Sequence, residues 1–369
     1  MTTLQSIQKL GQSLWYDNMR RGLIDSGAFG QLISDGITGV TSNPAIFAAA
    51  ISKSTDYNTA VTQAVAQGIR DPKALYEHLA IDDIRRAADL FKPVYDRSHA
   101  HDGYVSLEVS PHLAHDTDGT VAEAVRLHAT VGRPNLMIKV PATAAGLPAI
   151  TRLIAKGISV NVTLLFAVGA YEQVADAYMK GLEQRLAEKK SVASIASVAS
   201  FFVSRIDTLV DELLSKKTGF DSLKGQIAIA NAYEAYASFQ KLEMSSRWKQ
   251  LAAAGAQSQR LLWASTSTKN PAYPKTMYVD ALIAQKTVNT IPPETVTALL
   301  ESPLQQRVRF TEQWDACIKS ARTKLEQLDS AGISLTKVTD QLLEEAIKKF
   351  AEPFDQLLTN LQQKASANS

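Results

Sequence analysis

The chain has 369 residues, which suits one large domain or two to three small ones, and its 45% of hydrophobic residues can form a substantial core. Its 39 lysines and arginines nearly balance 37 aspartates and glutamates, so a net charge of +2 gives no field to gather nucleic acid or an acidic membrane. One cysteine, Cys317, excludes a disulfide-stapled scaffold, and we see neither a secretory signal nor a run of roughly 18 apolar residues, so we expect a soluble cytoplasmic protein.

Short runs rich in β-branched and aromatic residues recur along the chain and predict strands. In chain order these eight runs are residues 13–17, 37–42, 104–109, 136–140, 158–163, 198–203, 261–265 and 287–291. Apolar residues three and four positions apart predict helices between them, the clearest being 72–92, 120–131, 147–156, 168–190, 205–214 and 226–254. After the eighth run the pattern is wholly helical.

This alternation is typical of βαβ units, and eight strands with crossover helices are the number that closes a (β/α)₈ barrel. The usual barrel of about 250 residues leaves about 120 for insertions and added helices. No Gly/Ser-rich linker divides the chain, so we predict one TIM-barrel domain over residues 1–369, with 300–369 largely as appended C-terminal helices. A doubly wound parallel sheet is the structural alternative.

Polar side chains interrupt runs that should be apolar on both faces. They are Asp17, Asn43, Glu108, Lys139, Asn161 and Ser200, at or near strand ends. Each one alone is most simply a side chain that reaches solvent. A barrel, however, brings the carboxyl ends of its strands to one mouth, so we expect the six to share a pocket. A lysine among carboxylates and amides indicates carbonyl chemistry, because burial penalises the charged amine and a neutral amine can form a Schiff base.

Other chemical motifs are weak. The chain has no glycine-rich dinucleotide fingerprint and no phosphate loop, so we expect no nucleotide cofactor. The run of His112, His115, Asp116 and Asp118 matches no strong metal-site spacing, and we interpret it as a polar loop and helix start.

Eight segments resemble the transaldolase family, most closely its longer bacterial type. They are SLWYDNMRRGLI, GITGVTSNPAIF, YVSLEVSPHLAHDT, NLMIKVPAT, ISVNVTLLF, ASFFVSRID, LLWASTSTKNPAY and TVNTIPPET. The resemblance implies a barrel enzyme of the pentose phosphate pathway that needs no cofactor or metal. Such an enzyme moves a dihydroxyacetone unit from sedoheptulose 7-phosphate or fructose 6-phosphate to glyceraldehyde 3-phosphate or erythrose 4-phosphate. The resemblance further implies sugar phosphates as small-molecule substrates and, because many relatives are dimers, a homodimer.

The resemblance also implies roles for catalytic residues. The segment MIKVPAT makes Lys139 the Schiff-base lysine, and WYD makes Asp17 the base that takes the proton from the C4 hydroxyl as the C3–C4 bond breaks. Glu108, in LEVSP, and Thr163 would handle the water that leaves and enters as carbinolamine and imine interconvert.

Substrate-binding residues follow in the same way. Asn43 and Asn161 would bind substrate hydroxyls, while Ser200 and Arg205 would contact hydroxyl and phosphate. Independently of the resemblance, Ser204 followed by Asp207 has the spacing of a helix-start box, which would put Arg205 at a helix N-terminus that suits phosphate.

The segment after the seventh run departs from many family members. They carry an arginine shortly after the serine that matches Ser265, whereas this chain offers Lys269 after a longer gap. A lysine supplies charge without a bidentate fork, so the second phosphate contact differs in kind.

Two other functions compete with transfer. A direct fructose 6-phosphate aldolase would use the same lysine and release free dihydroxyacetone, but such relatives are markedly shorter. A noncatalytic sugar-phosphate-binding barrel would be expected to lack Lys139, Glu108 or Asp17. The resemblance places a phenylalanine at Phe202 where direct aldolases have tyrosine, and we expect this ring to face the pocket and keep the adduct dry.

Overall fold

The computed structural model describes residues 1–302 and 307–367. Eight strands form a closed barrel in chain order, and each neighbouring pair is parallel, including β1 with β8. The strands are β1 (Gln12–Asp17), β2 (Gly39–Thr41), β3 (Val105–Glu108), β4 (Leu136–Pro141), β5 (Val160–Leu165), β6 (Ser197–Phe202), β7 (Arg260–Ala264) and β8 (Thr287–Ile291). The predicted barrel is confirmed, and the doubly wound alternative is wrong.

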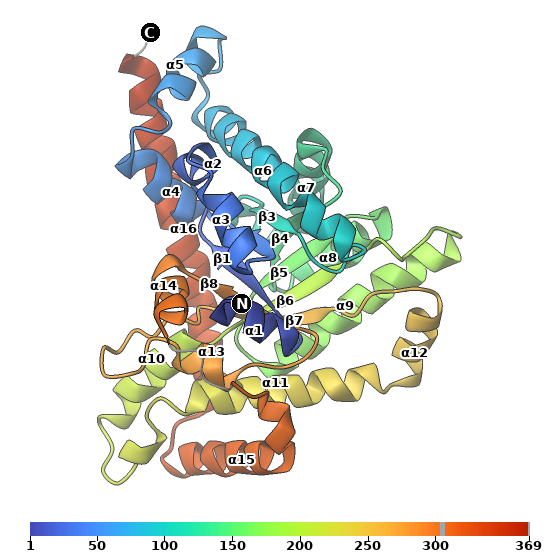
Figure 1. Cartoon of the computed structure of the whole chain (residues 1–369), viewed down its shortest axis with the longest axis vertical. Helices are drawn as coiled ribbons and strands as arrows, with labels where there is room; N and C mark the ends of the chain where they lie inside the picture. The colour runs from blue at the N-terminus through green and yellow to red at the C-terminus, as the bar shows by residue number, and fades with distance from the viewer. Residues whose placement is uncertain (303–306, 368–369) are drawn as a thin grey trace.

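Helices surround the barrel and extend from both sides of it (Figure 1). Between strands the helices are α2 (Arg21–Asp25), α3 (Ala28–Asp35), α4 (Pro44–Lys53), α5 (Asn58–Ala66), α6 (Pro72–Arg97), α7 (Thr117–Val131), α8 (Gly146–Lys156), α9 (Val168–Ala187), α10 (Ser204–Leu214), α11 (Ile227–Glu243), α12 (Ser246–Ala253) and α13 (Met277–Ala281). Helix α1 (Thr3–Lys9) precedes the barrel, and α14 (Pro293–Glu301), α15 (Trp314–Ser330) and α16 (Leu335–Ala367) follow it. Single 3₁₀ turns are η1 (Pro111–Leu113), η2 (Asp221–Leu223) and η3 (Phe310–Gln313).

The helix predicted over 226–254 is wrong as one element. The chain turns between α11 and α12, where the Ser245 hydroxyl accepts a hydrogen bond of 3.2 Å from the backbone N–H of Trp248 and begins the second helix. A serine that caps a helix accepts a hydrogen bond from a backbone N–H that would otherwise be unpaired. The spacing of apolar residues continues across such a cap, so it does not reveal that one helix ends and another begins.

Helix α6 shows the opposite error, because it continues through Pro93 to Arg97 although we predict its end at residue 92. Proline removes one helical hydrogen bond. Phe91 and Val94 are nevertheless buried on either side of it, so packing against the barrel sustains the helix.

The C-terminal helices pack against different parts of the barrel. Helix α15 packs on α11, and α16 contacts α4, α5, α6, α10 and β5. In Figure 1 the red helix α16 accordingly runs along one side of the molecule, from beside α4 and α5 toward α10. A segment that the sequence presents as an appendage therefore reaches a barrel strand.

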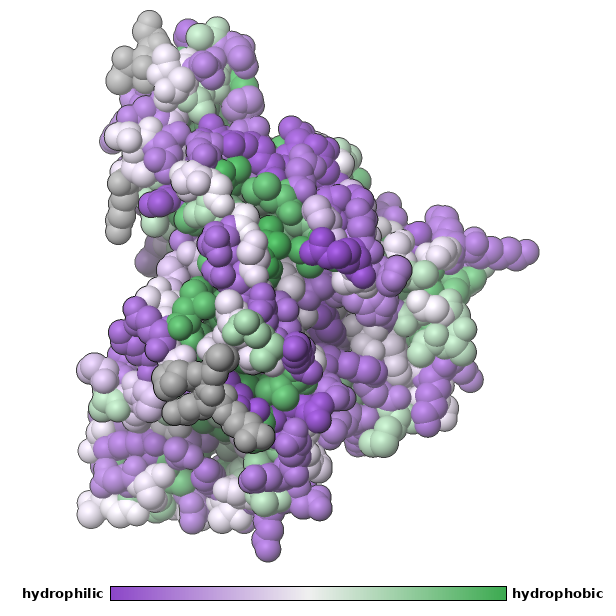
Figure 2. Space-filling view, in the orientation of Figure 1, coloured by the Kyte–Doolittle hydropathy of each residue, from purple (hydrophilic) through white to green (hydrophobic). Residues whose placement is uncertain are grey.

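Hydrophilic residues dominate the face shown in Figure 2, and hydrophobic residues appear there in separate patches between helices. Within the described residues, no helix combines the length and the apolar character that crossing a bilayer requires.

Candidate active site

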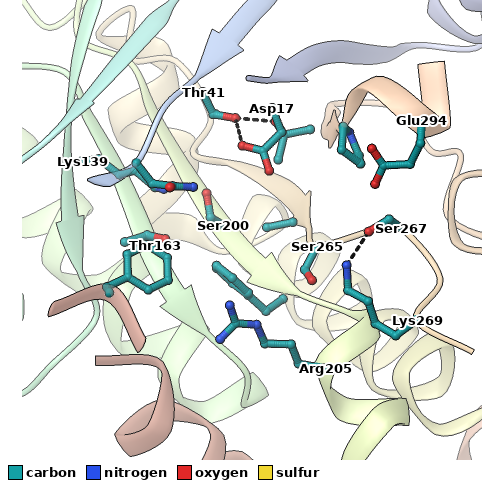
Figure 3. Close-up of a pocket in the computed structure, with 16 residues that line it drawn as sticks. Asp17, Thr41, Lys139, Thr163, Ser200, Arg205, Ser265, Ser267, Lys269 and Glu294 are labelled. Atoms are coloured by element: carbon teal, nitrogen blue, oxygen red, sulfur yellow. Dashed lines mark hydrogen bonds between the residues drawn. The ribbon is translucent and has the colours of Figure 1, made fainter. Parts of the chain in front are cut away.

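A cavity of about 230 Å³ opens where the strands end (Figure 3). Its wall contains nine residues predicted from the sequence, namely Asp17, Asn43, Lys139, Thr163, Ser200, Phe202, Arg205, Ser265 and Lys269. Seven residues in the wall were not predicted, namely Thr41, Ala264, Ser267, Thr290, Pro292, Glu294 and Phe350. Glu108 and Asn161, which were predicted, lie behind the wall rather than in it.

Lys139 and Glu108 form a buried ion pair. They are register partners on β4 and β3, so their side chains leave the sheet on the same face. The Lys139 Nζ lies 3.2 Å from the Glu108 Oε2 and donates a hydrogen bond of 3.4 Å to the backbone oxygen of Ser42. Burial raises the pKa of Glu108, and the nearby ammonium opposes that rise. The amine is thus held beside a carboxyl group that can exchange a proton with it.

Two buried oxygens at this site have no hydrogen-bond partner among the described residues. One is the Glu108 Oε2, whose only contact is the ion pair with Lys139, and the other is the Thr163 Oγ1. Strand β5 changes register between Val162 and Leu165, and Leu164 has a φ of 65°. Strand irregularities and left-handed non-glycine residues concentrate where a side chain must be re-aimed for function. Buried oxygens without partners are places where a bound water is expected.

Asp17 lies on the opposite side of the cavity from Thr163 in Figure 3. Its Oδ1 accepts a hydrogen bond of 2.8 Å from the Thr41 hydroxyl, which lies 2.5 Å from the Thr290 hydroxyl. Burial raises the pKa of Asp17, while the charge of Lys139 and the Thr41 bond oppose the rise. A carboxyl group with a raised pKa is suited to accept and return a proton.

The polar layer below the cavity connects three strands. The Ser200 hydroxyl donates to the Asn161 Oδ1 over 2.7 Å, and the Asn161 Nδ2 donates to the Ser106 hydroxyl over 3.0 Å. Asn161 is fully buried, so in this structure its amide orients Ser200. Asn43 reaches the wall itself, and its Oδ1 also caps α4 by accepting from the Ile46 N–H over 2.9 Å.

Two cations lie at the far end of the cavity, at the lower right of Figure 3. The Arg205 guanidinium carbon is 5.6 Å from the centroid of the Phe202 ring, and burial lowers the pKa of this arginine. The Lys269 Nζ donates to the Ser267 hydroxyl over 2.6 Å. Within the part of the chain that is described, no carboxylate pairs directly with Arg205, so its fork is available to an anion.

The predicted helix-start box is wrong. Helix α10 begins at Ser204, whose hydroxyl lies 2.9 Å from the hydroxyl of Ser265 instead of capping the helix. Asp207 accepts from the Ala228 N–H over 2.7 Å and from the Tyr278 hydroxyl over 2.8 Å. Partners from α11 and α13 thus replace the local ones. Arg205 still lies in the first turn of α10, as expected.

Three of the seven wall residues that were not predicted have a clear tertiary origin. Thr41 is the register partner of Asp17 on the neighbouring strand β2, whereas Thr290 of β8 reaches Thr41 only because the barrel closes. Phe350 comes from α16, and its ring centroid lies 5.6 Å from the Lys139 Nζ. None of these three residues is a candidate from the sequence alone. The two threonines do lie in segments, TSNP and TVNTIPPET, that carry the resemblance to the family.

The polar residues between His112 and Asp118 contact different parts of the same chain and do not converge on one point. His112 pairs with Asp355 over 2.7 Å, and Asp116 caps α7 by accepting from the Gly119 N–H over 2.9 Å. Asp118 pairs with Arg152. Among the residues that the structure describes, no cluster of three histidine, cysteine or carboxylate side chains could hold a metal ion.

Comparisons with known proteins agree with this geometry. The model of the transaldolase/fructose-6-phosphate aldolase family matches residues 14–361. A transaldolase of Trichodesmium erythraeum is 46% identical over 98% of this chain and 97% of its own length. A transaldolase of Saccharopolyspora erythraea is 47% identical over 98% of each chain, and one of Neisseria gonorrhoeae is 43% identical over 98% of this chain and all of its own. The chain therefore belongs to the transaldolase family.

Proposed function

We propose that this protein is a transaldolase that moves a dihydroxyacetone unit between sugar phosphates through a Schiff base on Lys139. The observation that carries the proposal is the buried amine of Lys139 in the cavity wall, 3.2 Å from the Glu108 carboxylate. A buried lysine beside a proton acceptor can become a neutral nucleophile, and no metal or nucleotide is needed for the steps that follow.

The first step joins substrate and lysine. The neutral Nζ of Lys139 attacks the C2 carbonyl of the ketose phosphate, and the carbinolamine then loses water to give an iminium ion. Glu108 and Thr163 are assigned to this water, since the Glu108 carboxylate lies beside the amine and the buried Thr163 hydroxyl has no hydrogen-bond partner among the described residues. Protonation by the Glu108 carboxyl would make the hydroxyl a better leaving group.

The second step breaks the carbon chain. Asp17 takes the proton of the C4 hydroxyl, the C3–C4 bond breaks, and its electron pair moves into the iminium to form an enamine, while the C4 fragment leaves as an aldehyde. The acceptor aldehyde then enters, the enamine carbon attacks it, and Asp17 returns the proton to the new alkoxide. Water finally adds to the product iminium, and the C–N bond breaks to release the new ketose phosphate and the amine of Lys139. The bond from the Thr41 hydroxyl holds the Asp17 carboxylate in place for both transfers.

The remaining wall residues are assigned to substrate binding. Arg205 and Lys269 would hold the phosphate, and Ser265 lies beside them in the wall. Ser200 and Asn43 offer hydrogen bonds to substrate hydroxyls, with Asn161 orienting Ser200. These roles remain predictions, as do the homodimer, the cytoplasmic location and the single-domain organisation.

Transfer is favoured over direct aldol cleavage. The family description covers both activities, whereas the three relatives named above are transaldolases. Phe202 also lies in the cavity wall, where an aromatic ring without a hydroxyl cannot hold water against the enamine. A noncatalytic barrel is not favoured, because Lys139, Glu108 and Asp17 are all present.

Trapping the adduct tests the proposal. The protein is incubated with fructose 6-phosphate, reduced with borohydride and digested, and the masses of the peptides are measured by mass spectrometry. We expect one three-carbon adduct, on Lys139, and transfer to erythrose 4-phosphate in the untreated protein. Lys139→Ala should lose both, whereas Lys180→Ala, at an exposed position on α9, should lose neither. An active Lys139→Ala variant, or an adduct on another lysine, would overturn the Schiff-base assignment.

A further inference from the structure

Helix α16 places an aromatic side chain directly against the reactive amine. Phe350 lies in the wall of the cavity, is only 7% exposed, and has its ring centroid 5.6 Å from the Lys139 Nζ. It is the only wall residue that follows β8 and α14 in the described chain. The barrel strands alone therefore leave this side of the amine uncovered.

The position of Phe350 is held by contacts that α16 makes in the turns after it. One turn later the Phe354 ring packs edge-on against Tyr76 of α6, with centroids 5.3 Å apart, and Asp355 pairs with His112. Near the end of the helix, the Asn360 Nδ2 donates to the Ser52 hydroxyl of α4 over 3.0 Å. Such contacts hold α16 against α4, α6 and η1 and fix where its side chains enter the cavity.

The part of α16 just before Phe350 lies near Arg205, at the end of the cavity that is assigned to phosphate. The negative charge of Glu345 favours the charged form of Arg205, and α16 contacts both α10 and β5. The helix thus spans from the arginine assigned to phosphate to the strand that carries Thr163, with Phe350 between them. In Figure 3 the red-brown ribbon of the C-terminal region passes near Thr163.

We propose that Phe350 is a positioning residue of the transfer reaction, which covers the Lys139 adduct and keeps water from the imine carbon while the enzyme waits for an acceptor. The proposal rests on the transaldolase function proposed above. It assigns to α16 a part in deciding between transfer and release, where the sequence indicated only an appended helix.

The chemistry shows why covering matters. Release of free dihydroxyacetone requires a proton to add to the enamine carbon and a water molecule to add to the imine carbon. The C–N bond of the resulting carbinolamine then breaks, and its electron pair and a proton return to Lys139. An apolar ring beside the amine withholds the water that this route consumes. In transfer the enamine carbon attacks an aldehyde first, and water adds to the imine carbon only afterwards, when the product ketose is released from Lys139. Water must therefore be withheld only while the three-carbon enamine waits for its acceptor.

The ring also suits the charged intermediate. An iminium nitrogen at the Lys139 position carries positive charge, and a cation within about 6 Å of a ring centroid is attracted by the aromatic face. Phe350 can therefore replace part of the solvation that the adduct loses when water is excluded.

The experiment compares two truncations on the same helix. Phe350→Ala opens the active cavity, whereas Phe354→Ala disturbs the packing of α16 at Tyr76, outside that cavity. For each variant, the release rate is the formation of glyceraldehyde 3-phosphate from fructose 6-phosphate without acceptor. The transfer rate is the formation of sedoheptulose 7-phosphate when erythrose 4-phosphate is added.

We expect Phe350→Ala to raise the ratio of release to transfer by about tenfold, and Phe350→Leu, which retains apolar bulk, to raise it less. Phe354→Ala should leave the ratio near that of the unchanged protein even if both rates fall. An unchanged ratio in a folded Phe350→Ala variant would overturn the proposal. An equal rise in Phe354→Ala would also overturn it, because general loosening of α16 would then be the cause.

Borohydride trapping separates this result from a failure of the proposed function. If the unchanged protein forms the Lys139 adduct and the ratios do not differ, only the role of Phe350 is rejected. If it forms no adduct, the Schiff-base function itself is rejected, whatever the ratios show.

Discussion

Arg205 and Lys269 offer an anion two different kinds of contact at the same end of the cavity. Arg205 presents a planar fork above the Phe202 ring, whereas Lys269 presents a point charge hydrogen-bonded to Ser267. A guanidinium can bind two phosphate oxygens at once, and an ammonium on a flexible stem is less well organised. The two residues should therefore contribute unequally to recognition of phosphate.

Arg205→Ala should lower kcat/KM for fructose 6-phosphate by about 10- to 100-fold, because hydrogen bonds to charged groups contribute about 1.5–3 kcal/mol. Unphosphorylated fructose should be much less affected. Steady-state kinetics with both donors measures the difference, and Lys269→Ala serves as the matched variant with a smaller expected loss. An equal loss on both donors would assign Arg205 a structural role.

Phe202 lines the cavity on the side of β6, where it would face the proposed Lys139 adduct. Its ring lies 5.2 Å from that of Phe166 and beneath the Arg205 guanidinium, and it reaches the cavity wall. Phe202→Tyr adds a hydroxyl that can hold water there, so we expect slower transfer and about tenfold faster acceptor-independent cleavage, a change of about 1.4 kcal/mol in the barrier. Cleavage is followed as glyceraldehyde 3-phosphate released without acceptor. If transfer falls and cleavage stays constant, the ring serves packing alone.

At the scale of elements, a buried network fixes the chain that follows β1 and Asp17. The Arg21 Nε lies 2.8 Å from the Asp83 Oδ1 of α6, and the Tyr57 hydroxyl donates to the Asp83 Oδ2 over 2.7 Å. The same hydroxyl accepts from the Arg21 N–H over 3.1 Å. One phenol thus joins α2, α5 and α6 where they approach the mouth of the barrel.

Tyr57→Phe should lower the free energy of unfolding by about 1–3 kcal/mol, because it leaves a buried carboxylate and a backbone N–H with fewer partners. Urea denaturation measures the change. The matched control is Tyr171→Phe on α9, which removes a buried hydroxyl that has no hydrogen-bond partner in the described structure, and it should be nearly neutral. Similar losses in the two variants would show that the network around Asp83 adds nothing beyond packing.

At the scale of the whole molecule, one buried carboxyl makes stability depend on pH. Burial raises the pKa of Asp207 to about 7, although the Ala228 N–H and the Tyr278 hydroxyl favour the charged form. Between the ordinary aspartate value near 4 and this value, the folded protein binds a proton that the unfolded chain has lost. The contribution of Asp207 to the free energy of unfolding therefore falls as the pH rises from about 4 to 7.

Asp207→Asn replaces this group with a neutral side chain of the same shape. Relative to the unchanged protein, we expect the variant to gain about 2 kcal/mol of unfolding free energy between pH 5 and pH 8. Urea denaturation at both pH values measures it, with Asp118→Asn, at an 87% exposed side chain, as the control for a lost surface charge. A difference between variant and parent that does not change with pH would contradict the raised pKa.

The sequence by itself determined the barrel and predicted nine of the residues that line the cavity. Side chains of a strand alternate between its two faces, so parity predicted that Glu108, Lys139, Asn161 and Ser200 point inward, and the structure joins Glu108 to Lys139 and Ser200 to Asn161. The eightfold alternation of strand and helix then sufficed to bring their ends together. Both patterns can be recognised within a few residues of the chain. A strand that is buried on both faces must be almost wholly apolar, so a polar residue inside it is easily detected.

Only the tertiary structure decided which distant residues complete the site. Thr290 contacts Thr41 because the barrel closes. Asp207 accepts a hydrogen bond from Tyr278 rather than forming a helix-start box with Ser204, because a buried carboxyl group pairs with the donors that tertiary packing brings to it. Phe350 reaches Lys139 because α16 lies over the strand ends. The apolar stripe of a helix specifies that it must be covered, but almost any apolar surface satisfies that requirement, so its spacing does not say which surface.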